Sequence, residues 1–188
     1  MNDLVARYEN NGKVLEIYFD PSPQNPRNWD NLGTMVCLHR RYSLGDEHDY
    51  KSSHFSSWEE VRKAIERDND VAVILPIYLY DHSGLVLSTA PFHCPWDSGQ
   101  VGWVYVTKEK LREEYGVKYV TKKIREIAVE VLNGELDVYS EYITGNVFGY
   151  VLKDEDEKEI ESIWGFYGTD FSANGLAAHA GTEWKQFL

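Results

Sequence analysis

Short runs of hydrophobic residues, several of them alternating with polar residues, predict that β-strands make up much of this chain. The predicted strands span residues 13–19, 35–39, 71–80, 85–89, 101–106, 147–152 and 160–167. Asp81 to Gly84 has turn chemistry and joins two of these strands, which predicts a hairpin. The acidic run Asp154 to Glu157 predicts the tip of a second hairpin. In the strand that follows this tip, the alternation places Ile160, Ser162, Trp164 and Phe166 on one face.

Hydrophobic residues at the spacing of a helix occur mainly between these strands. The predicted helices span residues 58–68, 108–115, 122–132 and 136–143, and the tail 172–188 is weakly helical. Ser57 and Glu60 form a capping box at the first helix. Gly134 is expected to end the third helix.

The predicted elements favour a single α+β domain over residues 1–188. Strands outnumber helices and hairpins dominate, so the sheet should be mostly antiparallel, with helices inserted between strands. A length of 188 residues suits one domain. Pro76 cannot donate a hydrogen bond inside the apolar strand 71–80, which predicts a bulge or kink there.

The chain is strongly acidic, with 31 Asp and Glu residues against 19 Lys and Arg and a net charge of −12. Direct binding to duplex DNA is not expected, because that binding depends on positive side chains that displace counterions from phosphates. An acidic protein instead approaches basic surfaces, including the nucleic-acid channels of other proteins. The simpler alternative is that the charge only keeps the protein soluble.

The two cysteines, Cys37 and Cys94, do not form the framework of a secreted disulfide-rich protein. Cys37 lies in an apolar run and is expected to be buried. The first residues lack a signal-peptide pattern, and the longest apolar run, 71–80, is far shorter than a membrane span. We therefore expect a cytoplasmic protein that does not enter a membrane.

No strong catalytic motif is present in the sequence, which lacks a phosphate-binding Gly-rich loop, a nucleophile elbow, a Cys-x-x-Cys pair and a His-Glu-x-x-His helix. Two polar loops flank the predicted central hairpin, one with Asp81 and His82 and the other with His93 and Asp97. If these loops converge, the four side chains could bind a divalent metal or serve as acid and base. The alternative is ordinary turn chemistry.

Three further features are candidates for binding. The His39-Arg40-Arg41 cluster could bind a phosphate, or it could form ion pairs with the acidic residues that follow it, Asp46, Glu47 and Asp49. The run Asp154-Glu155-Asp156-Glu157 is either a solvated turn or a projecting segment whose negative charges resemble those of phosphate groups. Trp96 is expected to pack onto the sheet, with partner binding as the alternative.

Several motifs resemble a family of small acidic proteins that are carried by bacteriophages, plasmids and other mobile elements. They are Asn25 to Met35, His39 to Asp46, Ile74 to Gly84, Cys94-Pro95-Trp96-Asp97-Ser98-Gly99-Gln100-Val101-Gly102 and Trp164 to Gly168. Some proteins of this kind act as anti-CRISPR inhibitors, so the resemblance implies an anti-defence role in a bacterial host. It implies no catalytic residues.

Charge and resemblance together predict a non-enzymatic inhibitor that needs no cofactor and binds a host defence protein, in particular an RNA-guided CRISPR effector ribonucleoprotein. The alternative is a metal-dependent nuclease or related hydrolase that uses Asp81, His82, His93 and Asp97. A third hypothesis is a phage structural or regulatory protein that forms a homo-oligomer through its aromatic surface.

Overall fold

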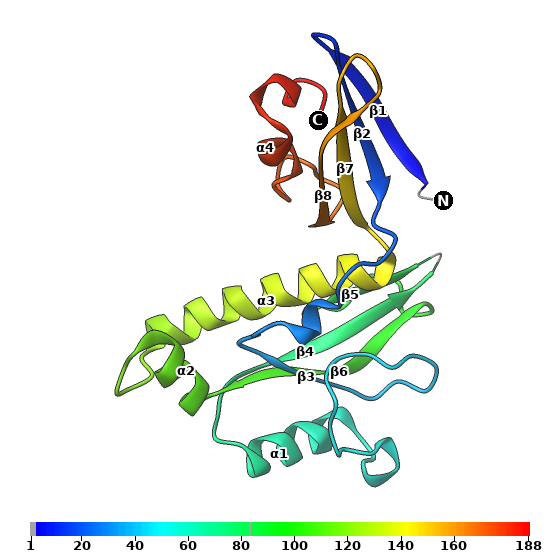
Figure 1. The fold of residues 1–188 in the computed structure, drawn as a ribbon. Coiled ribbons are helices and arrows are strands. Elements are labelled where there is room, and N and C mark those ends of the chain that lie inside the picture. Colours follow the sequence, from blue (N-terminus) through cyan, green and yellow to red (C-terminus); the bar gives the residue numbers. More distant parts are fainter. Residues whose placement is uncertain (1–2, 83) are drawn as a thin grey trace. The chain divides into compact units, whose positions relative to one another are not determined.

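The computed structural model describes residues 3–82 and 84–188, and its fold is α+β, as the sequence predicted. The chain divides into two compact units (Figure 1). The terminal unit consists of Met1–Asn25 and Glu141–Leu188, and the central unit of Pro26–Ser140. The expectation that residues 1–188 behave as one domain stays a prediction.

Two four-stranded antiparallel sheets form the framework, one in each unit. The strands are β1 (Leu4–Asn10), β2 (Lys13–Phe19), β3 (Thr34–Cys37), β4 (Val71–Asp81), β5 (Leu85–Ser88), β6 (Ser98–Thr107), β7 (Val147–Lys153) and β8 (Glu159–Tyr167). The α-helices are α1 (Trp58–Asp68), α2 (Lys108–Tyr115), α3 (Lys122–Thr144) and α4 (Leu176–Ala180). Three short 3-10 helices complete the set: η1 (Pro26–Asn28), η2 (Ser52–His54) and η3 (Thr182–Trp184).

The sheet of the terminal unit has the strand order β1-β2-β7-β8, so strands from both ends of the chain pair at its centre. The C-terminal segment with α4 and η3 packs against its core, in which Trp184 is fully buried. The core residues are Leu15, Ile17, Phe148, Tyr150, Leu152, Phe166, Leu176, Ala180 and Trp184. The weakly helical tail thus completes the hydrophobic core of this unit.

The sheet of the central unit has the order β3-β6-β4-β5, and Figure 1 shows α1 and α3 on opposite sides of it. Val61 and Ile65 of α1 pack with Val36, Trp103 and Tyr105 of the sheet. The capping box at α1 is present in a shifted form: Ser57 accepts from the Glu60 N–H, while the Glu60 carboxylate accepts from the N–H of Ser56.

The structure differs from the sequence predictions at α3 and at β1. The prediction that a helix ends at Gly134 is wrong, because α3 runs without interruption from Lys122 to Thr144. Leu132 and Leu136, on either side of Gly134, are both buried, and this packing outweighs the poor helix propensity of glycine. The strand β1 was not predicted, although the Asn11-Gly12 pair that joins it to β2 is the strongest short hairpin signal.

The predicted face of β8 is also wrong, since a β-bulge interrupts its alternation. Phe166 pairs with Phe148 and Trp164 pairs with Gly149, so Gly165, at φ 88°, is the extra residue. As a result Phe166 is in the core, whereas Ile160 and Trp164 are exposed. Pro76 itself pairs in register with Trp103, and the irregularity expected at Pro76 lies beside it, where the β4–β6 register shifts between Ile77 and Tyr78.

Two glycines with opposite surroundings provide a test of this packing. A Cβ at Gly102 would lie 2.2 Å from the carbonyl oxygen of Val36 on the neighbouring strand, whereas a Cβ at Gly134 would meet no atom within 4 Å. We expect Gly102→Ala to destabilise the fold by about 2 kcal/mol or more. Gly134→Ala should stabilise it by about 0.5–1 kcal/mol. Urea unfolding followed by circular dichroism measures both, and a loss of stability in the Gly134 variant would contradict an uninterrupted α3.

Candidate functional site

The hairpin between β7 and β8 presents carboxylates on a fixed turn, which confirms the predicted hairpin tip. The Asp154 Oδ1 atom accepts hydrogen bonds from the backbone N–H groups of Asp156 and Lys158, both at 2.9 Å. The N–H of Asp154 donates to the carbonyl of Lys158, also at 2.9 Å. Glu155, Asp156 and Glu157 are all exposed. We call Asp154–Glu157 the acidic tip.

Neighbouring cations neutralise only part of the acidic tip. Glu157 pairs with Arg7 at 2.8 Å and with Lys153 at 3.7 Å, and Asp156 pairs with Lys158 at 3.1 Å. Within residues 3–82 and 84–188, Glu155 has no ion-pair partner. The tip therefore keeps net negative charge.

Beneath this tip lies Glu16 of β2, which is only 5% exposed. Its carboxylate accepts from Lys153 Nζ at 2.7 Å and from the Tyr18 hydroxyl at 2.6 Å, and Arg7 Nε lies 3.9 Å away. Burial alone would raise the pKa of Glu16, but these hydrogen bonds and positive charges outweigh it, so the pKa lies below its ordinary value. The hydrogen bond to Glu16 raises the pKa of Tyr18. This network ties β1, β2 and β7 together.

At the end of the central sheet formed by the β4–β5 hairpin, the structure brings together the side chains of two of the four residues proposed for a metal or catalytic site, His82 and Asp97. The N–H of Asp81 donates to the carbonyl of Asp97 at 2.8 Å, and His82 Nδ1 lies 3.5 Å from Asp97 Oδ2. Cys94 Sγ lies 3.6 Å from the same Oδ2 atom. His93 is exposed on the loop between β5 and β6.

The Asp81 carboxylate is not directed at this group. It forms an ion pair with Arg41 and accepts from the Tyr42 hydroxyl at 3.3 Å. Among the described residues, no group of three or more His, Cys, Asp or Glu side chains is placed to hold a metal ion. These contacts are those of an ion-paired turn. Sequence reasoning missed Arg41 as a partner because it comes from a different loop, whereas Cys94 lies on the same loop as Asp97.

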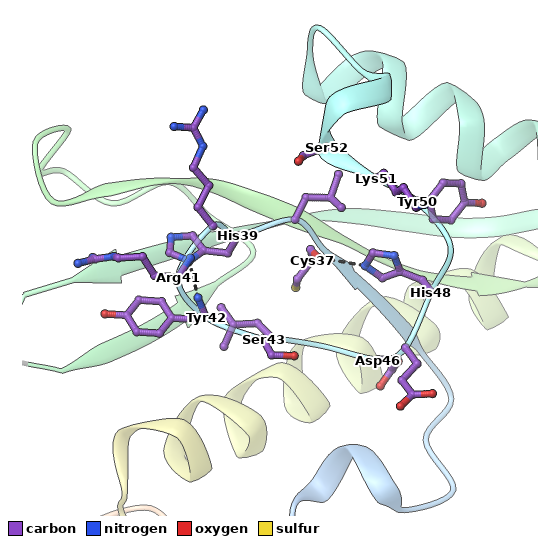
Figure 2. Close-up of a pocket in the computed structure, with 14 residues that line it drawn as sticks. Cys37, His39, Arg41, Tyr42, Ser43, Asp46, His48, Tyr50, Lys51 and Ser52 are labelled. Carbon is purple, nitrogen blue, oxygen red and sulfur yellow. Dashed lines mark hydrogen bonds between the residues drawn. The ribbon is translucent and has the colours of Figure 1, made fainter.

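The His39-Arg40-Arg41 cluster lies on a loop that lines a cleft of about 590 Å³ (Figure 2). The acidic neighbour Asp46 pairs with Arg27 at 2.7 Å, so it is engaged away from the cluster. Arg27 is 4% exposed and also lies 3.7 Å from Glu135 of α3. Arg41 pairs with Asp81 from β4, and Arg40 is exposed.

Trp96 projects into solvent with 92% of its surface exposed, so the expectation that it packs onto the sheet is wrong. Phe92 occupies that position instead, with its ring 5.6 Å from the ring of Tyr80 on β4. The loop that carries Trp96 is nevertheless braced, because Ser98 Oγ donates to the carbonyl of Cys94 at 2.6 Å. An exposed tryptophan on a braced loop is typical of a contact residue in a protein interface.

Comparisons of the chain with protein-family models, with curated proteins and with solved structures found no match. The resemblance to small acidic proteins of mobile elements therefore stays a prediction. Over the described ranges, none of the helices combines the length and the apolar character needed to span a bilayer.

The Glu16 network predicts a pH dependence of stability. A lowered folded-state pKa stabilises the fold above the unfolded value of about 4.3, and this contribution is lost as the pH falls through the folded-state pKa. Glu16→Gln should therefore cost about 1.5–3 kcal/mol at pH 7, where a charge-assisted hydrogen bond is lost. The difference from wild type should shrink at pH 3. Urea unfolding at the two pH values measures this difference, with Glu159→Gln on β8 of the same sheet as the exposed control. A difference that does not change with pH would contradict the network.

The exposure of Trp96 predicts that its removal leaves the fold intact. Trp96→Ala should change the free energy of unfolding by less than about 0.5 kcal/mol, as substitutions at exposed sites do. Trp103→Ala is the contrast, because Trp103 is buried and donates from Nε1 to the Trp58 carbonyl at 3.0 Å; it should cost about 3 kcal/mol or more. If the melting temperature fell equally in the two variants, Trp96 would have to pack against the fold.

Proposed function

We propose that this protein is a non-catalytic inhibitor that binds the basic nucleic-acid channel of a host defence nuclease, an RNA-guided CRISPR effector being the best candidate. The observation that carries the proposal is the uneven distribution of charge. The terminal unit has 13 Asp and Glu residues against five Lys and Arg residues, a net charge of −8. The larger central unit has 18 against 14, a net charge of −4.

The geometry of the acidic tip supports this role. The hydrogen bonds of Asp154 hold the turn, so Glu155 and Asp156 are presented without first having to be ordered. Clustered carboxylates are attracted to the Lys and Arg residues that otherwise bind phosphates. A channel that holds a guide–target duplex through its backbone offers a surface of that kind.

Trp96, which lies in the central unit, is a second feature that supports binding to a protein partner. Its exposed ring offers a large apolar contact area at little entropic cost, and such residues supply much of the binding energy in protein interfaces. Charge then guides the approach of the partner, while the tryptophan contributes to the lifetime of the complex.

The test is binding to a guide-loaded effector nuclease, measured by biolayer interferometry at low and at physiological salt. Wild-type protein should bind more tightly at low salt and should inhibit cleavage of target DNA. Glu155→Gln with Asp156→Asn should weaken binding by about tenfold, a loss of about 1.4 kcal/mol. The matched control is Glu113→Gln with Glu114→Gln on exposed positions of α2, which changes the charge equally and should bind as wild type does.

Two results would overturn the proposal. Absence of binding at low salt would exclude the effector as the partner. An equal loss in the tip variant and the α2 control would show that overall charge, and not the acidic tip, governs binding. Trp96→Ala tests the proposed tryptophan contact separately from the acidic tip. This variant should shorten the lifetime of the complex and leave the association rate nearly unchanged.

A further inference from the structure

The cleft at the 38–52 loop combines exposed cations with a fixed imidazole, and it lies entirely within the central unit. Figure 2 shows His39, Arg41 and Tyr42 on one side of Cys37 and His48 and Tyr50 on the other. We propose that this cleft binds a phosphorylated small molecule of up to mononucleotide size by its phosphate group. The proposal is independent of the acidic tip and of its partner.

The first argument is the state of the cations. In the described part of the chain, residues 3–82 and 84–188, Arg40 and Lys51 are exposed and have no ion pair. Asp46, a carboxylate in the lining, is engaged by Arg27, which leaves the exposed Glu47 as the opposing charge. In a chain with a net charge of −12, two cations without carboxylate partners beside one cleft favour an anionic ligand.

The second argument is the orientation of His39. Its Nδ1 atom accepts from the backbone N–H groups of Arg41 at 3.3 Å and Tyr42 at 3.2 Å, which leaves Nε2 as the ring nitrogen that can donate. The ring also stacks on Tyr42, with the centroids 4.9 Å apart and the planes at 10°. The imidazole is thus held as a hydrogen-bond donor, and a phosphate oxygen is a suitable acceptor.

The third argument is that the frame of the loop is fixed before any ligand arrives. The N–H of Leu38 donates to the carbonyl of Val101 at 2.8 Å, and the N–H of Gly45 donates to the Tyr139 hydroxyl at 3.0 Å. The N–H of Asp46 donates to the carbonyl of Met35 at 2.9 Å. A volume of about 590 Å³ falls in the range of small-molecule sites and exceeds what a lone phosphate needs.

The experiment is a titration of the ¹⁵N-labelled full chain with inorganic phosphate, AMP and adenosine, followed by amide chemical shifts. Phosphate and AMP should shift the amides of residues 39–42 and 51, and adenosine, which has no phosphate, should not. Arg40→Gln with Lys51→Gln should weaken AMP binding by about tenfold or more, because two charged hydrogen-bond donors are lost. The control, Lys118→Gln with Lys123→Gln, removes the same charge from exposed positions elsewhere and should bind as wild type does.

Three outcomes would overturn the inference. They are the absence of shifts with both phosphate and AMP at low salt, equal weakening in the two double variants, and shifts with adenosine as large as those with AMP. None of these outcomes bears on the effector-binding experiment, which uses different residues and a different ligand.

Discussion

The pairing of β2 with β7 is the constraint on which the terminal unit depends. Val14 to Phe19 pair in register with Lys153 to Phe148, although the whole central unit lies between them in the sequence. Closing so long a loop costs conformational entropy, and the buried core that includes Ile17 and Tyr150 offsets it. The Glu16–Lys153 ion pair spans the same two strands, so charge and core stabilise one register.

A buried ion-pair network likewise holds the 38–52 loop of the central unit. Arg27 is almost fully buried, pairs with Asp46, lies near Glu135 and donates to the carbonyl of Gly33 at 2.6 Å. Glu135 of α3 accepts from the backbone N–H groups of Leu32 and Gly33, at 2.6 and 3.0 Å. A buried charge of this kind is retained only when it is paired and hydrogen-bonded. The network anchors the segment before β3 and the loop after it, so the cleft keeps its shape.

The two units differ in how they present charge. In the terminal unit, carboxylates gather at the end of a hairpin and their charge is only partly neutralised. In the central unit, acids and bases are nearly balanced, and Arg40 and Lys51 remain exposed beside the cleft. The two proposed roles are physically compatible in one chain, because electrostatic attraction acts locally once salt screens longer distances.

The sequence by itself determined the local structure: the α+β class, most strands, the helix caps and the acidic tip. These features depend on neighbouring residues, as with Ser57 at α1 and Asp154 at the tip. Only the tertiary structure decided the rest. Whether Gly134 ends a helix, whether Trp96 or Phe92 packs on the sheet, and whether Arg41 pairs with Asp46 or Asp81 all depend on segments distant in the sequence. Local propensities amount to about 1 kcal/mol or less at each residue, and burial of a large side chain outweighs them.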